Sequence, residues 1–113
     1  MLAVVAAMVM QAAQPDGGEA AAKAARAEAC LIQIESLIVE AYQETGRVAG
    51  PSWFIRDWWT ARLPKPGQAG ALTEDQRRQA IANAPARKAG DPTGFAEERR
   101  SCIHEAMEAG AVP

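Results

Sequence analysis

The chain has 113 residues, which is enough for one domain and too few for two. Its formal net charge is -2 at pH 7, so it lacks the overall basic excess of a typical nucleic-acid-binding protein. Hydrophobic residues make up 49% of the chain but aromatic residues only 5%, so the core has to be built from few large side chains.

Residues 1–18 predict a signal peptide followed by a disordered leader. Residues 2–10, LAVVAAMVM, form an apolar run with the length of a signal-peptide hydrophobic region, well short of the roughly 20 residues that a membrane span requires. No Lys or Arg precedes this run, and cleavage after Ala13 or after Ala20 fits the small-residue pattern only in part. We expect a periplasmic or secreted protein; the alternative is a cytosolic protein in which the run is a buried helix.

Residues 19–113 predict a single all-α domain, a small bundle of about four helices in which two longer terminal helices surround a short aromatic one. The first helix, residues 19–45, follows the turn-forming residues 15–18 and ends at Gly46. Apolar residues share one of its faces and polar residues the other. The predicted apolar face contains Ala27, Cys30, Leu31, Ile34, Leu37, Ile38, Ala41 and Tyr42, and the predicted polar face contains Arg26, Gln33, Ser36, Glu40 and Gln43.

A short second helix is predicted from Ser52 to Leu63, with Ser52 as its N-cap and Pro64 forcing it to end. Its large apolar side chains share one arc, which is wide enough to fill the groove between the longer helices. This arc contains Phe54, Ile55, Trp58, Trp59 and Leu63.

Two further helices complete the predicted bundle. Thr73 and Gln76 match a capping box, so a third helix should start there and end or fray before Pro85. The last helix is predicted over residues 95–109, with Gly110 closing it.

The two cysteines lie on the predicted core faces of the first and last helices. Cys30 belongs to the apolar arc of the first helix, and Cys102 shares the core side of the last helix with other apolar residues. In an oxidising compartment such a pair forms a disulfide, and two cysteines permit only one intramolecular pairing. We predict a Cys30–Cys102 bridge; the alternative is two buried free thiols.

The second helix also carries the candidate partner surface. Trp53 projects beside Arg56 on the polar side of this helix, and Arg62 follows at its end. Trp and Arg are favoured at the energetic centres of protein interfaces, and Trp beside Arg also suits membrane headgroups. We expect Trp53, Arg56 and Arg62 to meet an unknown protein partner, with weak membrane-surface contact as an alternative use. The alternative is a structural role, in which Trp53 folds back over the preceding loop and meets no partner.

Glu35 projects into the predicted apolar face of the first helix, where Glu28 and Tyr42 continue the same line at seven-residue spacing. A partly buried carboxylate requires a cationic partner. Arg56 or Arg62 is the candidate, and we predict a buried Glu35–Arg56 ion pair. An enzyme that uses Glu35 and Tyr42 is the less favoured hypothesis, because the sequence indicates no further positioned group and no cleft.

No catalytic, cofactor or metal site is predicted. His104 is the single histidine, and no second ligand lies at metal-binding spacing from it. The glycines lie at helix ends and turns rather than in a phosphate-binding loop.

The sequence therefore favours an exported helical protein-interaction module. The predicted architecture, a helical domain with one disulfide behind a leader, is also similar in outline to small periplasmic acid-stress chaperones. This similarity lies in the architecture alone, and no sequence motif of this chain supports it. A holdase chaperone that loses structure and exposes its aromatic helix at low pH is therefore the alternative.

Overall fold

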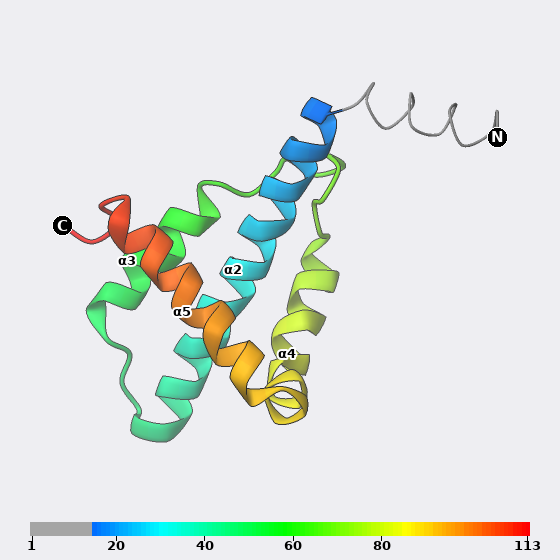
Figure 1. The fold of residues 1–113 in the computed structure, drawn as a ribbon. Coiled ribbons are helices and arrows are strands. Elements are labelled where there is room, and N and C mark those ends of the chain that lie inside the picture. The colour runs from blue at the N-terminus through cyan, green and yellow to red at the C-terminus, as the bar shows by residue number, and fades with distance from the viewer. Residues whose placement is uncertain (1–14) are drawn as a thin grey trace.

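The computed structural model describes residues 15–113, which form four helices (Figure 1). Helix α2 spans Pro15–Thr45, α3 spans Gly50–Thr60, α4 spans Glu74–Gly90 and α5 spans Pro92–Glu108. No strand occurs between residues 15 and 113. The predicted all-α bundle is thus confirmed, whereas most of the predicted leader lies outside the described residues.

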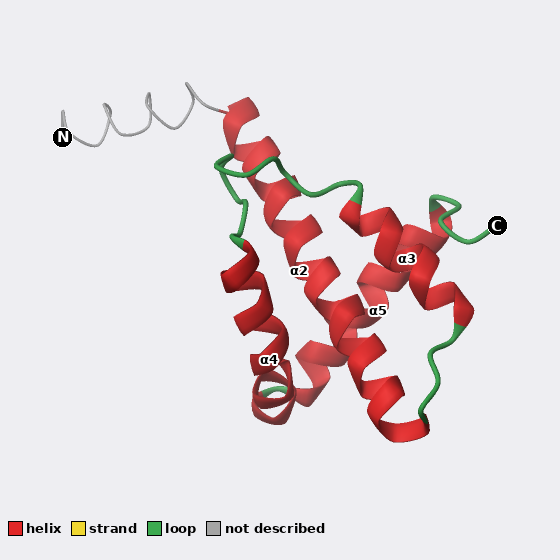
Figure 2. Ribbon diagram, turned by 180° about the vertical axis from the view of Figure 1, so that it is seen from behind, coloured by secondary structure: helices red, strands yellow, loops and turns green. Residues whose placement is uncertain are grey.

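Helix α2 is the central element of the bundle. Helices α3 and α4 lie on opposite sides of it, and α5 crosses it obliquely (Figure 2). Helix α5 contacts each of the other three helices, so it joins the two sides of the molecule.

The sequence predicted the C-terminal end of α2 but not its N-terminal part. Residues 15–18 belong to α2, so the predicted break before residue 19 is wrong. The predicted end at Gly46 is confirmed: Gly46 has a φ of 71° and donates its N–H to the Tyr42 carbonyl at 2.8 Å.

Helix α3 is shifted toward the N-terminus relative to the prediction. It begins at Gly50 and ends at Thr60, and Ala49 rather than Ser52 is the N-cap residue. Pro51 lies in the first turn, where its fixed φ favours the helix. The helix therefore starts ahead of the predicted cap, and hydrogen-bonded turns lead from Thr60 to Leu63.

The predicted capping box at the start of α4 is confirmed. The Thr73 hydroxyl accepts a hydrogen bond from the Gln76 amide at 3.1 Å, and the Gln76 side chain accepts one from the Thr73 amide at 2.9 Å. Two amides that would otherwise lack partners are therefore satisfied.

The predicted end of α4 before Pro85 is wrong, because the helix continues through it to Gly90. The proline removes one backbone hydrogen bond. Ion pairs hold the segment that follows it: Lys88 contacts Glu40 of α2 at 2.7 Å, and Arg87 contacts Glu98 of α5 at 3.1 Å. These tertiary contacts offset the local cost of the proline.

Helix α5 begins earlier than predicted, at Pro92 instead of Phe95. The Asp91 side chain accepts a hydrogen bond from the Gly94 amide at 3.0 Å and so caps the helix. Asp91 is also the only residue between α4 and α5, which replaces the predicted loop by a sharp corner. Gly110, with a φ of 83°, follows the end of the helix as predicted.

The core lies where α2, α3 and α5 meet. Cys30, Ile34 and Cys102 are completely buried in it, and Trp59 is 2% exposed. The buried cluster consists of Ala27, Cys30, Leu31, Ile34, Ile38, Ile55, Trp59, Cys102 and Ala106.

Helix α2 buries more of its circumference than its polarity pattern predicts. Gln33 and Ser36 were assigned to the polar face but are buried, whereas Tyr42 of the predicted apolar face is 66% exposed. Gln33 donates hydrogen bonds to the Phe95 carbonyl at 3.2 Å and to the Glu98 carboxylate at 2.7 Å. Helices α4 and α5 cover the predicted polar face, so the central helix has two buried sides.

Candidate functional site

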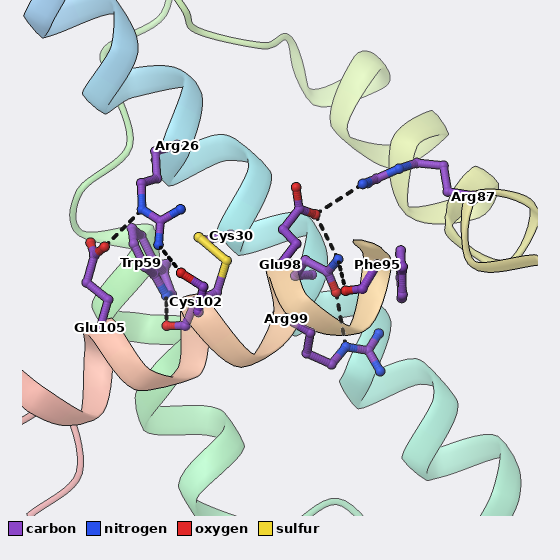
Figure 3. The surroundings of a disulfide bond; sticks show 11 residues. Arg26, Cys30, Trp59, Arg87, Phe95, Glu98, Arg99, Cys102 and Glu105 are labelled. Atoms are coloured by element: carbon purple, nitrogen blue, oxygen red, sulfur yellow. Dashed lines mark hydrogen bonds and ion pairs between the residues drawn. A yellow bond between two sulfur atoms is a disulfide. The ribbon is translucent and has the colours of Figure 1, made fainter. Parts of the chain in front are cut away.

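The predicted disulfide is confirmed and lies at the centre of the core (Figure 3). Its cysteines join α2 to α5 with a Cα–Cα distance of 5.3 Å, and neither is exposed to solvent. Trp59 of α3 donates its indole N–H to the Cys102 carbonyl at 3.1 Å. Three helices thus converge on the bridge, and the buried sulfurs are shielded from exchange with an external thiol.

Trp53 and Phe54 form an exposed aromatic pair on α3. Trp53 is 41% exposed and Phe54 is 46% exposed. Phe54 was predicted to face the core, so that assignment is wrong. The Arg56 guanidinium lies 4.9 Å from the centre of the Trp53 ring, and Asp57 pairs with Arg56 at 2.9 Å. We call Trp53, Phe54 and Arg56 the Trp53 face.

Arg62 lies in the turn after α3 and belongs to a different surface from Trp53. Its guanidinium carbon lies 3.4 Å from the centre of the Trp58 ring, and it donates a hydrogen bond to the Trp58 carbonyl at 2.8 Å. Trp53 and Trp58 are five positions apart, which turns them by roughly 140° around a helix. The structure therefore brings Trp53 and Arg56 together and separates them from Arg62.

The predicted buried ion pair between Glu35 and Arg56 is wrong. Arg56 pairs with its neighbour Asp57, and Glu35 takes part in no ion pair between described residues. Glu35 is only partly buried, so it can remain hydrated without a cationic partner. The buried carboxylate of this helix is instead Glu28, two turns earlier.

Glu28 forms the most complete polar site of the molecule. Its side chain is 3% exposed, and Arg77 of α4 binds both carboxylate oxygens at 2.9 Å. The Leu72 amide donates a third hydrogen bond to it at 2.9 Å. The hydrogen bonds from Arg77 to Glu28 raise the pKa of Arg77 above its usual value. Such a bidentate pair fixes both the position and the orientation of α4.

Glu40 is the second carboxylate that links α2 to other helices. It accepts ion pairs from Lys88 of α4 and from Arg99 of α5. Burial raises the pKa of Glu40, but the hydrogen bonds and positive charges of Lys88 and Arg99 outweigh it, so this pKa lies below its usual value. Glu40 therefore stays ionised at neutral pH and stabilises the junction of three helices.

The remaining candidates, Tyr42 and His104, are exposed side chains. Tyr42 is 66% exposed, and His104 lies 3.8 Å from Glu108 with both side chains 72% exposed. Among residues 15–113, no three His, Cys, Asp or Glu side chains are grouped closely enough to hold a metal ion. The described helices also include none that is both long and apolar enough to span a bilayer.

Comparison with protein-family models, curated proteins and solved structures finds no match to this chain. Three sets of side chains are therefore the candidates for a functional role. These are the Trp53 face, the contact between Arg62 and Trp58, and the ion pairs of α4.

Proposed function

We propose that this chain is an exported helical module that binds another protein through the Trp53 face of α3. The observation that carries the proposal is the exposure of Trp53 and Phe54, at 41% and 46%, next to each other on a helix of eleven residues. Exposed adjacent aromatic rings beside an arginine are typical of the energetic centre of an interface. The cation–π contact with Arg56 holds Trp53 in place and so reduces the entropy lost on binding.

Export is supported by the buried disulfide. A bridge that joins α2 to α5 inside the core fits a protein that folds in an oxidising compartment such as the periplasm or the extracellular space. Cell fractionation with alkylation of free thiols tests this part of the proposal. We expect the protein in the periplasmic or extracellular fraction with both cysteines protected; a cytoplasmic, fully alkylated protein would contradict export.

The binding surface is tested by photo-crosslinking in the native cells. A photoreactive amino acid at position 57, on α3, should give a discrete crosslinked protein, because Asp57 is exposed beside Arg56. The same group at position 79, on the exposed side of α4, is the positional control. The double substitution Trp53→Ala and Phe54→Ala should abolish the product from position 57.

The matched substitution control is Val39→Ala, since Val39 is an equally exposed apolar residue on the α4 side of α2. Equal crosslinked products from positions 57 and 79 would show that the Trp53 face is not the binding surface. A product from position 57 that persists after Trp53 and Phe54 are both replaced would show the same.

Sedimentation with anionic vesicles distinguishes a protein partner from a membrane surface. Vesicle binding that depends on Trp53 would replace the protein partner by a lipid surface.

The attachment of α4 favours a second candidate, an acid-activated holdase chaperone. Helix α4 is held in part by Glu40, whose pKa lies below its usual value because of its hydrogen bonds and ion pairs, and the ion pair with Lys88 is lost when this carboxylate is protonated. Circular dichroism at pH 2–3, combined with a client-aggregation assay, tests this candidate. An unchanged fold with no client protection would eliminate it.

A further inference from the structure

Helices α2, α3 and α5 enclose a hollow of about 350 Å³ on the Trp58 side of α3. Trp58 and Trp59 are among its lining residues, and their rings meet edge to face with centres 4.8 Å apart. Arg26 of α2 lies over the Trp59 ring and pairs with Glu105 of α5 at 2.9 Å, as Figure 3 shows. The lining of this hollow therefore combines two tryptophan rings with charged side chains.

A second hollow of about 490 Å³ continues the first toward the start of α2. The two share Lys23 and Arg62, so these cations stand at their junction. Small apolar residues, Ala20, Ala24 and Pro64, line much of the second hollow. Together the hollows form an elongated track, which we call the Trp58 groove.

The two cations at the junction have no anionic partner within the described structure. Arg26 is neutralised by Glu105, whereas neither Lys23 nor Arg62 forms an ion pair with any described side chain. Both are exposed to solvent. Stacking on Trp58 and the bond to the Trp58 carbonyl fix the Arg62 guanidinium, which leaves further N–H groups for a ligand. The junction thus presents two unpaired cations, and contacts with Trp58 hold the Arg62 guanidinium in place.

We propose that the Trp58 groove binds an extended segment of a partner polypeptide in which an acidic residue is flanked by apolar residues. The carboxylate would lie between Lys23 and Arg62, and the apolar side chains would occupy the hollows on either side. A carboxylate offers two oxygens, one for each of the two unpaired cations. The net charge of -2 at pH 7 does not favour a polyanion such as nucleic acid. The groove lies apart from the Trp53 face and does not depend on it.

The proposal is tested by titrating the full, disulfide-bonded chain with a capped peptide, acetyl-Gly-Leu-Glu-Leu-Gly-amide, and with the same peptide carrying Gln in place of Glu. Two-dimensional NMR follows the Trp58 indole N–H, and the Trp53 indole N–H serves as the internal reference. We expect the Glu peptide to shift the Trp58 resonance but not that of Trp53. The Gln peptide should bind roughly tenfold more weakly, because it lacks the charge-assisted hydrogen bonds.

Variants of the protein assign the binding to the junction. Arg62→Gln should weaken binding of the Glu peptide roughly tenfold. Lys23→Gln, which leaves the Trp58 stack intact, should weaken it roughly threefold. Lys65→Gln is the control, since Lys65 lines neither hollow. Trp53→Ala with Phe54→Ala should leave binding unchanged, so this titration and the crosslinking experiment can fail separately.

Three results would overturn the proposal. One is equal binding of the Glu and Gln peptides, and another is equal weakening by Lys23→Gln and Lys65→Gln. The third is displacement of the Glu peptide by inorganic phosphate at a concentration equal to that of the peptide, which would make the junction a general anion site.

Discussion

Helices α3 and α4 pack against the same central helix, but different forces hold them. Helix α3 inserts Ile55 and Trp59 into the core beside the disulfide. Helix α4 buries only Ala84 completely, and its other attachments include the ion pairs of Arg77 and Lys88. Apolar burial is insensitive to protonation, whereas an ion pair requires a charged carboxylate. We therefore expect the attachment of α4 to weaken in acid while the apolar core of α2 and α3 is retained.

The largest expected effect is on the core side. Replacing Cys30 and Cys102 together by Ala should lower the free energy of unfolding by about 4 kcal/mol, because the bridge closes a long loop across 72 positions. Urea denaturation followed by circular dichroism measures it. A loss below about 1 kcal/mol would mean that packing alone holds α2 and α5 together.

The second-largest loss of stability is expected when the ion pair between Arg77 of α4 and Glu28 is broken. Arg77→Met leaves the Glu28 carboxylate buried without its partner, and the expected loss is about 3 kcal/mol. The loss should show as amide exchange confined to α4, because the core of α2, α3 and α5 is untouched. Adding Glu28→Gln to this variant removes the stranded charge and should restore most of the stability. Arg78→Met is the control, since Arg78 is 74% exposed.

A smaller effect is expected where α3 meets the bridge. Trp59→Phe removes the hydrogen bond to the Cys102 carbonyl and should cost about 1–2 kcal/mol in urea denaturation. Trp58→Phe is the matched control, because no hydrogen bond of the Trp58 indole to another described residue is present. An equal loss in both variants would show that ring volume, not the hydrogen bond, matters at Trp59.

The smallest effect is expected at the Trp53 face. Trp53→Ala removes only an exposed ring and its contact with Arg56, so the free energy of unfolding should fall by less than about 1 kcal/mol. Thermal unfolding measures this change. A loss above about 2 kcal/mol would assign Trp53 to the fold rather than to binding.

The sequence predicted the parts of the fold that depend on local patterns. Thr73 and Gln76 sit three residues apart in a capping box, and Cys30 and Cys102 lie on apolar stripes that meet in the core. Gly46 marked the end of the first helix. These features depend on nearby residues or on a single possible pairing, so they can be identified without knowing the packing.

The sequence did not predict which side of each helix is covered. A polarity pattern assigns one apolar face to a helix, but α2 contacts neighbours on more than one side, and Gln33 is buried as a result. Glu28 was noted only for its spacing from Glu35, and its partner Arg77 lies 49 positions away. Pro85 was expected to end its helix because the tertiary ion pairs beyond it were unknown. The Trp58 groove was missed for the same reason, since it requires α2 and α3 to be side by side.

Amide hydrogen exchange as a function of pH tests the contrast between α3 and α4 most directly. The pKa of Glu40 lies below its usual value of 4.5 in the folded protein, so its stabilisation is complete above about pH 4.5 and is lost as the pH falls through the folded pKa. After correction for intrinsic exchange rates, residues 74–90 should lose protection as the pH falls below about 4.5 while α3 retains its protection. Simultaneous loss in α3 and α4, or full protection of α4 at pH 3, would contradict this account.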